Sequence, residues 1–467
     1  MTQAIESALA AMRAAGLSER DAQQWSAVLP AGTGGYEQDA RDHGVYWRKS
    51  AALLQRLPPK PRRNEAEQRA AEALLSAARA SRESFLAAHV DEVYGLLTQR
   101  CSIFRRLDDL VYAAAKLVPG LVPTREEVEA EAAHPQRDKD GVEIDQGLFL
   151  AHVLAGARIG THLCHAMLLP RQESAVLAAE FASRGSLDLG PARLTRRGKA
   201  IHVETLNPRF LNAEDDTTLA ATEIAVDVAT LDPTTGIAVM RGATVDKGKR
   251  QGKRIFGAGV NLTHIYWGKI PYLWFLIRDM GYVHKLLRGV ASPDSVPDDV
   301  NGRGVEKLWI GAIDSFAIGG HCQSILCMDY LLAASDAYLT LPARKEGIIP
   351  GFSNLRLPRF VGDRIARQAI LYERRLECAS PEGRLICDEI APPAEMDAAI
   401  DRVVEGLTSA GAVSAIGNRR AIRVGQESLD LFRRYASVYA REQAYCHFSP
   451  ALIANLERNW DAKNRKI

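Results

Sequence analysis

The chain has 467 residues, of which 47% are hydrophobic and 25% are charged. This composition is typical of folded globular proteins and excludes wholesale disorder, and the length corresponds to about three average domains. Lys and Arg outnumber Asp and Glu by 59 to 57, so the net charge of +2 gives no reason to expect nucleic acid as a partner.

The sequence also predicts a cytoplasmic protein with no membrane partner. Glu6 comes early, and no basic segment precedes an apolar run, as a secretory signal would require. The most apolar stretch, 147–160, contains His152 and Arg158 and is too short to span a bilayer. The seven cysteines are scattered without a CxxC pair, which favours reduced thiols.

The first part of the chain is predicted to be helical. Thr124 and Glu127 form the pattern of a capping box. Periodic stretches rich in Ala, Glu and Arg, or carrying apolar residues at helical spacing, favour helices at 3–16, 64–99, 102–117, 124–134 and 145–169. We therefore expect an all-helical N-terminal domain over 1–198.

Strands and helices begin to alternate near residue 200, which indicates βαβ units. Helices are expected over Thr217–Leu231, from His264 onward and after Gly319-Gly320. Strands are expected at 201–207, 237–243, 308–314 and 336–342. From Pro393 the pattern is helical with no further sheet. The sequence thus predicts an α/β core at 199–395 and a helical C-terminal region at 396–467.

Two glycine-containing turns lead from a strand into a helix. They are Gly257-Ala258-Gly259-Val260-Asn261-Leu262 and Ile318-Gly319-Gly320-His321-Cys322-Gln323. Glycine lets the backbone approach a ligand closely, and the first turn of a helix directs free N–H groups at it. Two such amides can converge on one oxygen as an oxyanion hole. Taken alone, each turn is better explained as a tight connection.

The central region resembles the crotonase (enoyl-CoA hydratase/isomerase) superfamily. The similar segments occur in the family's order, at 206–215, 256–262, 312–342, 346–362 and 385–396. The resemblance implies stacked ββα turns, an acyl-CoA ligand, and an oxyanion hole made by the amides of Val260 and Gly320. It also implies that CoA passes over Pro208, Arg209 and the 257–262 backbone, and that the protein forms a trimer or a dimer of trimers.

Two positions depart from the hydratase pattern. Gln323 and Ala343 stand where hydratases of this family carry their two catalytic glutamates. Glutamine does not exchange a proton near neutral pH, and alanine has no polar group. Addition of water is therefore disfavoured, while an enolate-stabilising site with an apolar space at Ala343 is retained.

The whole chain resembles a narrower family, the (3,5-dihydroxyphenyl)acetyl-CoA 1,2-dioxygenases of vancomycin-type glycopeptide-antibiotic biosynthesis. The resemblance is carried by Gln323, Ala343 and the segments 265–289 and 342–351. It implies a reaction with O2 that uses neither metal nor flavin. It also implies release of CoA and formation of 3,5-dihydroxyphenylglyoxylate, a precursor of dihydroxyphenylglycine.

Several side chains are candidates for individual roles. Glu214 could accept a phenol or Cα proton, or be a solvated acid at a helix start. Arg278 could bind a phenolate together with Gln323, or form a surface ion pair. Ile348 could line an oxygen pocket with Ala343, or be plain core. The basic residues of 247–254 could meet CoA phosphates, or be solvated.

No metal is expected, because His162 and His165 have no carboxylate placed to complete a facial triad. Two alternative functions stay open on these residues. Another crotonase-type reaction, such as isomerisation or thioester hydrolysis, would proceed without O2. A non-catalytic acyl-CoA-binding protein would bind without turnover.

Overall fold

The structure, a computed structural model, describes residues 2–409 and 411–466. The N-terminal helices are α1 (Thr2–Ala14), α2 (Glu19–Ser26), α3 (Tyr36–Leu54), α4 (Glu65–Leu97), α5 (Leu107–Leu117), α6 (Arg125–Ala132), α7 (Ile144–Ala155), α8 (Ala157–Leu168) and α9 (Ser174–Arg184). The predicted helices are confirmed, and both arms of the capping box of Thr124 and Glu127 are present. The helix predicted over 145–169 is two helices, because the chain bends at Gly156. The sequence did not predict α2, α3 or α9.

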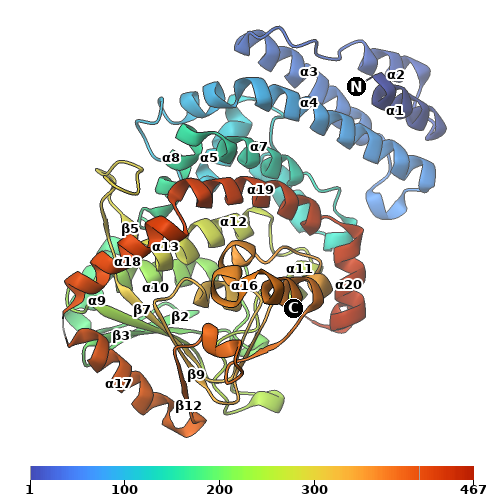
Figure 1. Cartoon of the computed structure of the whole chain (residues 1–467). Coiled ribbons are helices and arrows are strands. Elements are labelled where there is room, and N and C mark those ends of the chain that lie inside the picture. Colours follow the sequence, from blue (N-terminus) through green and yellow to red (C-terminus); the bar gives the residue numbers. More distant parts are fainter. Residues whose placement is uncertain (1, 410, 467) are drawn as a thin grey trace.

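A seven-stranded sheet in the order β1-β2-β3-β4-β7-β9-β12 forms the centre of the α/β part (Figure 1). Its strands are β1 (Ser186–Asp188), β2 (Ala192–Arg197), β3 (Ala200–Thr205), β4 (Ile237–Gly242), β7 (Leu308–Ile313), β9 (Tyr330–Ala334) and β12 (Glu389–Ala391). From β3 to β12 the neighbours run parallel, whereas β1 and β2 join one edge antiparallel. The strands predicted at 201–207, 237–243 and 308–314 are thereby confirmed.

Two further sheets are smaller. One has the order β11-β10-β8 and contains β8 (Phe316–Ile318), β10 (Tyr338–Thr340) and β11 (Leu376–Glu377). The other is the pair β5 (Val290–Ala291) and β6 (Gly304–Val305). The strand predicted at 336–342 is β10. The order β7, β8, helix and then β9, β10, helix is the repeated ββα turn that the resemblance implies.

The remaining helices surround these sheets. They are α10 (Leu219–Leu231), α11 (Leu262–Tyr266), α12 (Leu273–Met280), α13 (Tyr282–Arg288), α14 (Gly320–Ile325), α15 (Ala343–Glu346), α16 (Ser353–Tyr372), α17 (Met396–Thr408), α18 (Ala412–Gln426), α19 (Leu429–His447) and α20 (Pro450–Trp460). Within the described residues no strand follows β12, so the predicted helical C-terminal region is confirmed.

The expectation that 1–198 is wholly helical is wrong at its end, where β1 and β2 lie. In β2 only Ala192 and Leu194 are buried, and polar residues occupy the other positions. Such a short edge strand carries a weak apolar alternation, and its three arginines weaken it further. Gly185 and Gly190, which both have positive φ, are the residues that could have indicated turns on either side of β1.

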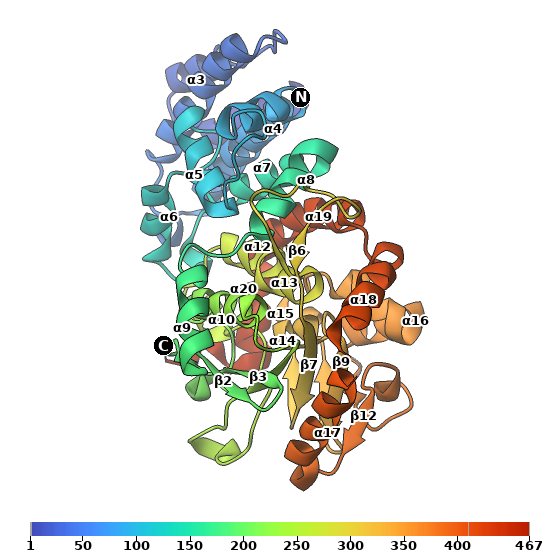
Figure 2. The same ribbon diagram turned by 90° about the vertical axis from the view of Figure 1, so that its left-hand side faces the viewer.

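Helices α12 and α13 join the two main hydrophobic cores. Trp274 and Phe275 of α12 belong to the core that contains the N-terminal helices and α19, whereas Tyr282 and Val283 of α13 belong to the core around the large sheet. Figure 2 shows α12 and α13 between these two parts. Because the first core draws on residues before 199, between 199 and 395, and after 395, the three-domain division stays a prediction.

No single helix in the described chain is both long and apolar enough to cross a membrane; α7 and α8 pass that test only as a pair bent by 111°.

Helix α7 packs closely along α19 through Gly147. A Cβ added there would lie 2.5 Å from Ala444 Cβ and 2.9 Å from the Ala440 carbonyl oxygen, closer than van der Waals contact allows. Gly95 of α4 has no such neighbour within 4 Å.

We expect Gly147→Ala to lower the free energy of unfolding by about 1–3 kcal/mol, because overpacking outweighs the gain in helix propensity. The matched variant Gly95→Ala is expected to raise it by about 0.5–1 kcal/mol. Urea denaturation of both variants measures the difference. Equal stabilisation by the two substitutions would show that α7 and α19 tolerate a wider separation.

Candidate active site

The two predicted glycine turns touch each other through their backbones. Gly259 (φ +81°) and Gly319 (φ +53°) both have the left-handed conformation that glycine adopts without strain. A Cβ on Gly259 would lie 2.9 Å from the Ile318 carbonyl oxygen and 3.3 Å from the Gly320 nitrogen. The contact between the two turns therefore places Val260 and Gly320 next to each other.

Val260 and Gly320 line the same cavity. Among the residues that the structure describes, neither amide donates to a side chain or to a carbonyl in a turn or loop. Two neighbouring free N–H groups are the donor pair that an oxyanion hole requires. This arrangement supports the predicted role of the two residues.

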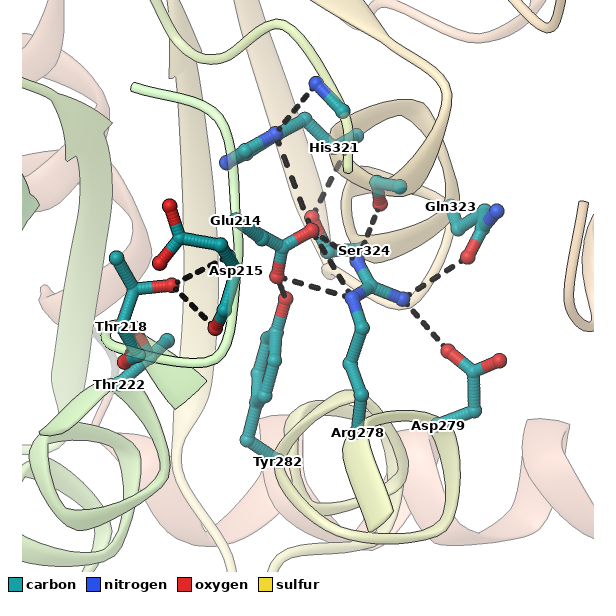
Figure 3. Close-up of polar contacts among 12 residues, drawn as sticks. Glu214, Asp215, Thr218, Thr222, Arg278, Asp279, Tyr282, His321, Gln323 and Ser324 are labelled. Atoms are coloured by element: carbon teal, nitrogen blue, oxygen red, sulfur yellow. Dashed lines mark hydrogen bonds and ion pairs between the residues drawn. The ribbon is translucent and has the colours of Figure 1, made fainter. Parts of the chain in front are cut away.

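Arg278 is the centre of the polar network beside this cavity (Figure 3). It is 2% exposed and lies on α12. Its Nε donates to the Glu214 carboxylate at 2.9 Å, and its Nη2 donates to the Gly320 carbonyl at 2.6 Å. Its Nη1 donates to Asp279 at 2.6 Å and to Gln323 Oε1 at 2.9 Å. The surface ion pair considered for Arg278 is wrong, since its guanidinium is buried and bonded on every side.

Glu214 is a buried carboxylate rather than a solvated acid. It is 6% exposed, and the Tyr282 hydroxyl donates to it in addition to Arg278. Burial alone would raise the pKa of Glu214, but the charge and hydrogen bonds of Arg278 hold it below its usual value. Its backbone binds the first glycine turn, because its amide donates to Gly259 and its carbonyl accepts from the Asn261 amide. Glu214 is therefore anionic and already paired.

Gln323 and His321 extend from α14 in defined orientations. Because Gln323 Oε1 accepts from Arg278, the amide N–H groups of Gln323 are left to donate toward the cavity that this residue lines. His321 Nδ1 accepts from the Gly259 amide at 3.1 Å, and burial lowers the pKa of His321 to about 4. A neutral His321 thus holds the turn that presents Val260.

The cavity is small and mostly apolar. Its volume is about 20 Å³, enough for about one small molecule. Ala343 and Ile348 both line it, as expected for an oxygen pocket, and so do Val260, Trp274, Phe275, Arg278, Asp279, Gly319, Gly320, Gln323, Leu341, Glu346, Ile349, Pro350 and Tyr439. Sites for drug-sized ligands measure about 300 Å³ or more, so side chains must move before an aryl group can enter.

Three residues of this site were not found from the sequence. Asp279 and Tyr282 are neighbours of Arg278 on α12 and α13, and nothing in the local pattern distinguishes them from core or surface residues. Glu346 lies one helical turn after Ala343 in α15, and that i,i+3 spacing was the signal available.

The residues expected near CoA differ in exposure, since Arg209 is exposed whereas Gly257, Gly259 and Asn261 are buried. Pro208 and Arg209 form a short 3-10 turn, and Arg209 is exposed. Gly257, Ala258, Asn261 and Leu262 frame Val260, and the Asn261 side chain caps α11 by accepting from the His264 amide. In the basic loop, Arg254 pairs with Glu204.

The histidines considered as metal ligands pack instead. His162 stacks on Phe104 at 4.5 Å between ring centroids and hydrogen-bonds Tyr94, and His165 bonds the Ser292 carbonyl. Within the described residues, one group has ligand atoms close enough for an ion: Asp215, Asp216 and His264. Asp215 already accepts hydrogen bonds from Asn207, Thr217 and Asn261.

These features define an acyl-CoA enzyme of the enoyl-CoA hydratase/isomerase class, the crotonase superfamily, and residues 302–418 match that family's model. The chain is 43% identical over 393 residues to a (3,5-dihydroxyphenyl)acetyl-CoA 1,2-dioxygenase from Amycolatopsis orientalis, covering 84% of this chain and 89% of the relative. The chain belongs to that dioxygenase family, and the prediction of an oxidoreductase is confirmed.

Two more distant similarities cover less of the molecule. A crotonyl-CoA hydratase from Syntrophomonas wolfei is 31% identical over 126 residues, which is 27% of this chain and 48% of the relative. The solved structure of an enoyl-CoA hydratase/isomerase from Xanthobacter autotrophicus Py2 is 19% identical, with a TM-score of 0.48, and covers 59% of this chain and 96% of that one.

We expect Arg278→Met to lower the free energy of unfolding at pH 8 by about 3–5 kcal/mol, because Glu214 loses its buried counter-charge. In the parent the folded-state pKa of Glu214 lies below its usual value of 4.5, so the pair stabilises the fold above that pH and this contribution is lost as pH falls. The effect of the substitution should still be smaller at pH 5 than at pH 8, because burial without the counter-charge raises the pKa of Glu214 in the variant and its protonated form needs no counter-charge.

Guanidinium denaturation at the two pH values measures this effect. The control is Arg367→Met, which removes an exposed ion pair with Asp363 (2.7 Å, side chains about 60% exposed) and should leave the midpoint unchanged. Equal midpoints for Arg278→Met and the parent would contradict the assignment of Arg278 as the ionic centre of the site.

Proposed function

We propose that the protein converts (3,5-dihydroxyphenyl)acetyl-CoA and O2 into 3,5-dihydroxyphenylglyoxylate and CoA, using neither metal nor flavin. Membership of the dioxygenase family supports this assignment. The observation that carries it is the cavity in which the free amides of Val260 and Gly320 lie beside Gln323 and Ala343, where hydratases would carry glutamates. Such a site stabilises an enolate without the two glutamates with which hydratases add water.

The chemistry begins with the thioester enolate. The two amides bind the thioester oxygen and lower the pKa of the Cα–H group. The doubly phenolic enolate then gives one electron to O2, a step for which most oxygenases need a cofactor. Recombination of the two radicals forms a peroxide at Cα. Its terminal oxygen attacks the thioester carbonyl and expels the CoA thiolate; the O–O bond then breaks as the second Cα proton is lost, leaving the keto acid.

Polar side chains of the site would orient the aryl ring. We propose that the free N–H groups of Gln323 donate to a phenol oxygen, with Arg278 fixing the direction of Gln323. Glu214, as a paired carboxylate, stays the candidate acceptor for a phenol proton. Ala343 and Ile348 would hold O2 in the apolar part of the cavity, which admits a molecule of that size. Exclusion of water there protects the peroxide.

Several finer assignments belong to the same proposal. CoA would pass over Pro208 and Arg209 and along the backbone of 257–262. We propose a trimer-based assembly, as similarity to the crotonase superfamily implies. A cytoplasmic location is supported by seven cysteines that are all free thiols.

The first test follows O2 uptake and free thiol together during incubation with (3,5-dihydroxyphenyl)acetyl-CoA and a strong chelator. We expect one O2 consumed for each thiol released, with the glyoxylate as product, because both oxygen atoms enter one substrate molecule. Thiol release without O2 uptake would identify a thioester hydrolase. Tight binding without either signal would identify an acyl-CoA-binding protein.

The oxygen pocket gives a second prediction. Ala343→Leu would fill the space beside the oxyanion hole and should reduce O2 consumption by at least about 10-fold while the thioester still binds. The control is Ala343→Gly, which leaves the space open and should retain O2 consumption. An oxygen electrode and a thermal-shift titration with substrate measure the two properties. Parent-like O2 uptake by the leucine variant would show that O2 binds elsewhere.

A further inference from the structure

Glu346 carries a buried carboxyl group that lies at the cavity. This group makes no bond to the network around Arg278. It is the last residue of α15, is 5% exposed, and lines the cavity together with Val260 and Gly320. Its two carboxyl oxygens lie 3.8 and 3.9 Å from the point that a Cβ on Gly319 would occupy. The carboxyl group is therefore next to the turn that forms half of the oxyanion hole.

This carboxyl group is unpartnered within the described part of the chain. No hydrogen bond or ion pair reaches its oxygens, whereas Glu214 accepts from Arg278 and Tyr282. The adjacent Lys345 turns away and pairs with Glu373 at 2.6 Å. Burial raises the pKa of Glu346 to about 7, and the negative charge of Glu373 adds to this. A lone buried carboxyl group that faces a cavity is able to exchange a proton with whatever occupies it.

We propose that Glu346 is the base that removes the Cα protons in the reaction proposed above, on which this inference rests. In the first step the Cα–H bond breaks, its proton moves to a Glu346 oxygen, and the electron pair stays on the substrate as the enolate. The amides of Val260 and Gly320 hold the enolate oxygen.

The same carboxyl group acts twice in one turnover. When the peroxide expels CoA, the thiolate takes the proton from Glu346 and leaves as the thiol. Glu346, again a carboxylate, accepts the second Cα proton as the O–O bond breaks and the keto group forms. O2 is the oxidant, both of its atoms end in the keto acid, and the second proton leaves Glu346 for solvent.

The groups around Glu346 define what else can titrate there. Arg278 and Asp279 face the cavity from α12, and each is bound to the other. Tyr439 faces it from α19, and its pKa is raised well above its usual value by burial. Glu373 lies at the end of α16. From α20, the neutral side chains of Asn455 and Asn459 bind the backbone of α15. Burial also raises the pKa of Asp279, which the charge and hydrogen bond of Arg278 oppose.

The test is exchange of the substrate's Cα protons for deuterium in D2O without O2, measured by mass spectrometry. The parent should exchange them, with a rate that rises with pH through a midpoint near 7. Glu346→Gln should exchange at least about 100-fold more slowly with unchanged substrate affinity, and Glu346→Asp should recover part of the rate. Glu373→Gln, the control, should keep the plateau rate and move the midpoint to lower pH.

The outcomes separate this inference from the function on which it rests. Exchange at the parent rate in Glu346→Gln, with O2 consumption intact in the parent, would overturn the role of Glu346 and leave the dioxygenase proposal standing. A parent that neither exchanges Cα protons nor consumes O2 would overturn both. If Glu346→Gln does not fold, the pH dependence of exchange by the parent serves as the test. A parent exchange rate that is independent of pH between 6 and 8 would overturn the role of Glu346.

Discussion

The buried guanidinium of Arg278 is the interaction on which the geometry of the site depends. It binds the Glu214 side chain and the Gly320 carbonyl, so it connects the two glycine turns that we propose form the oxyanion hole. The connection to Val260 runs through Glu214, whose backbone bonds the neighbouring residues Gly259 and Asn261. Because a buried charge tolerates only a fully bonded environment, this cation fixes the orientation of each group that it touches.

The position of α12 explains why the chain needs helices beyond the α/β core. Arg278 can be held in place only if its helix is packed firmly, and Trp274 and Phe275 of α12 lie in the core built largely from the N-terminal helices and α19. Tyr282 anchors the following helix in the core of the sheet. The helical regions thus supply the packing that carries the central cation of the site (Figure 2).

The sequence was sufficient for features that depend on local conformation. The two glycine turns were recognisable because Gly259 and Gly319 need positive φ, and strands such as β4 and β7 because their residues are nearly all apolar. Features that depend on partners from distant segments were not predictable. The bonds that Arg278 makes with Glu214, 64 residues earlier, and with Gln323, 45 residues later, leave no trace in local patterns. The isolation of Glu346 was hidden for the same reason, since its neighbour Lys345 suggests a pair that the fold does not form.

The arrangement of carboxyl groups suits a reaction of an anion with O2. Relative to a hydratase, the carboxyl group is absent at Ala343 and present one helical turn later at Glu346, which leaves an apolar space without removing the base. A carboxylate close to the forming peroxide would repel its negative charge, since charges interact strongly in a buried site. Glu346 avoids this conflict, because accepting the Cα proton makes it neutral before O2 reacts. With Gln323 neutral as well, and with Glu214 and Asp279 both bonded to Arg278, the enolate is then the negative charge that O2 meets in the cavity.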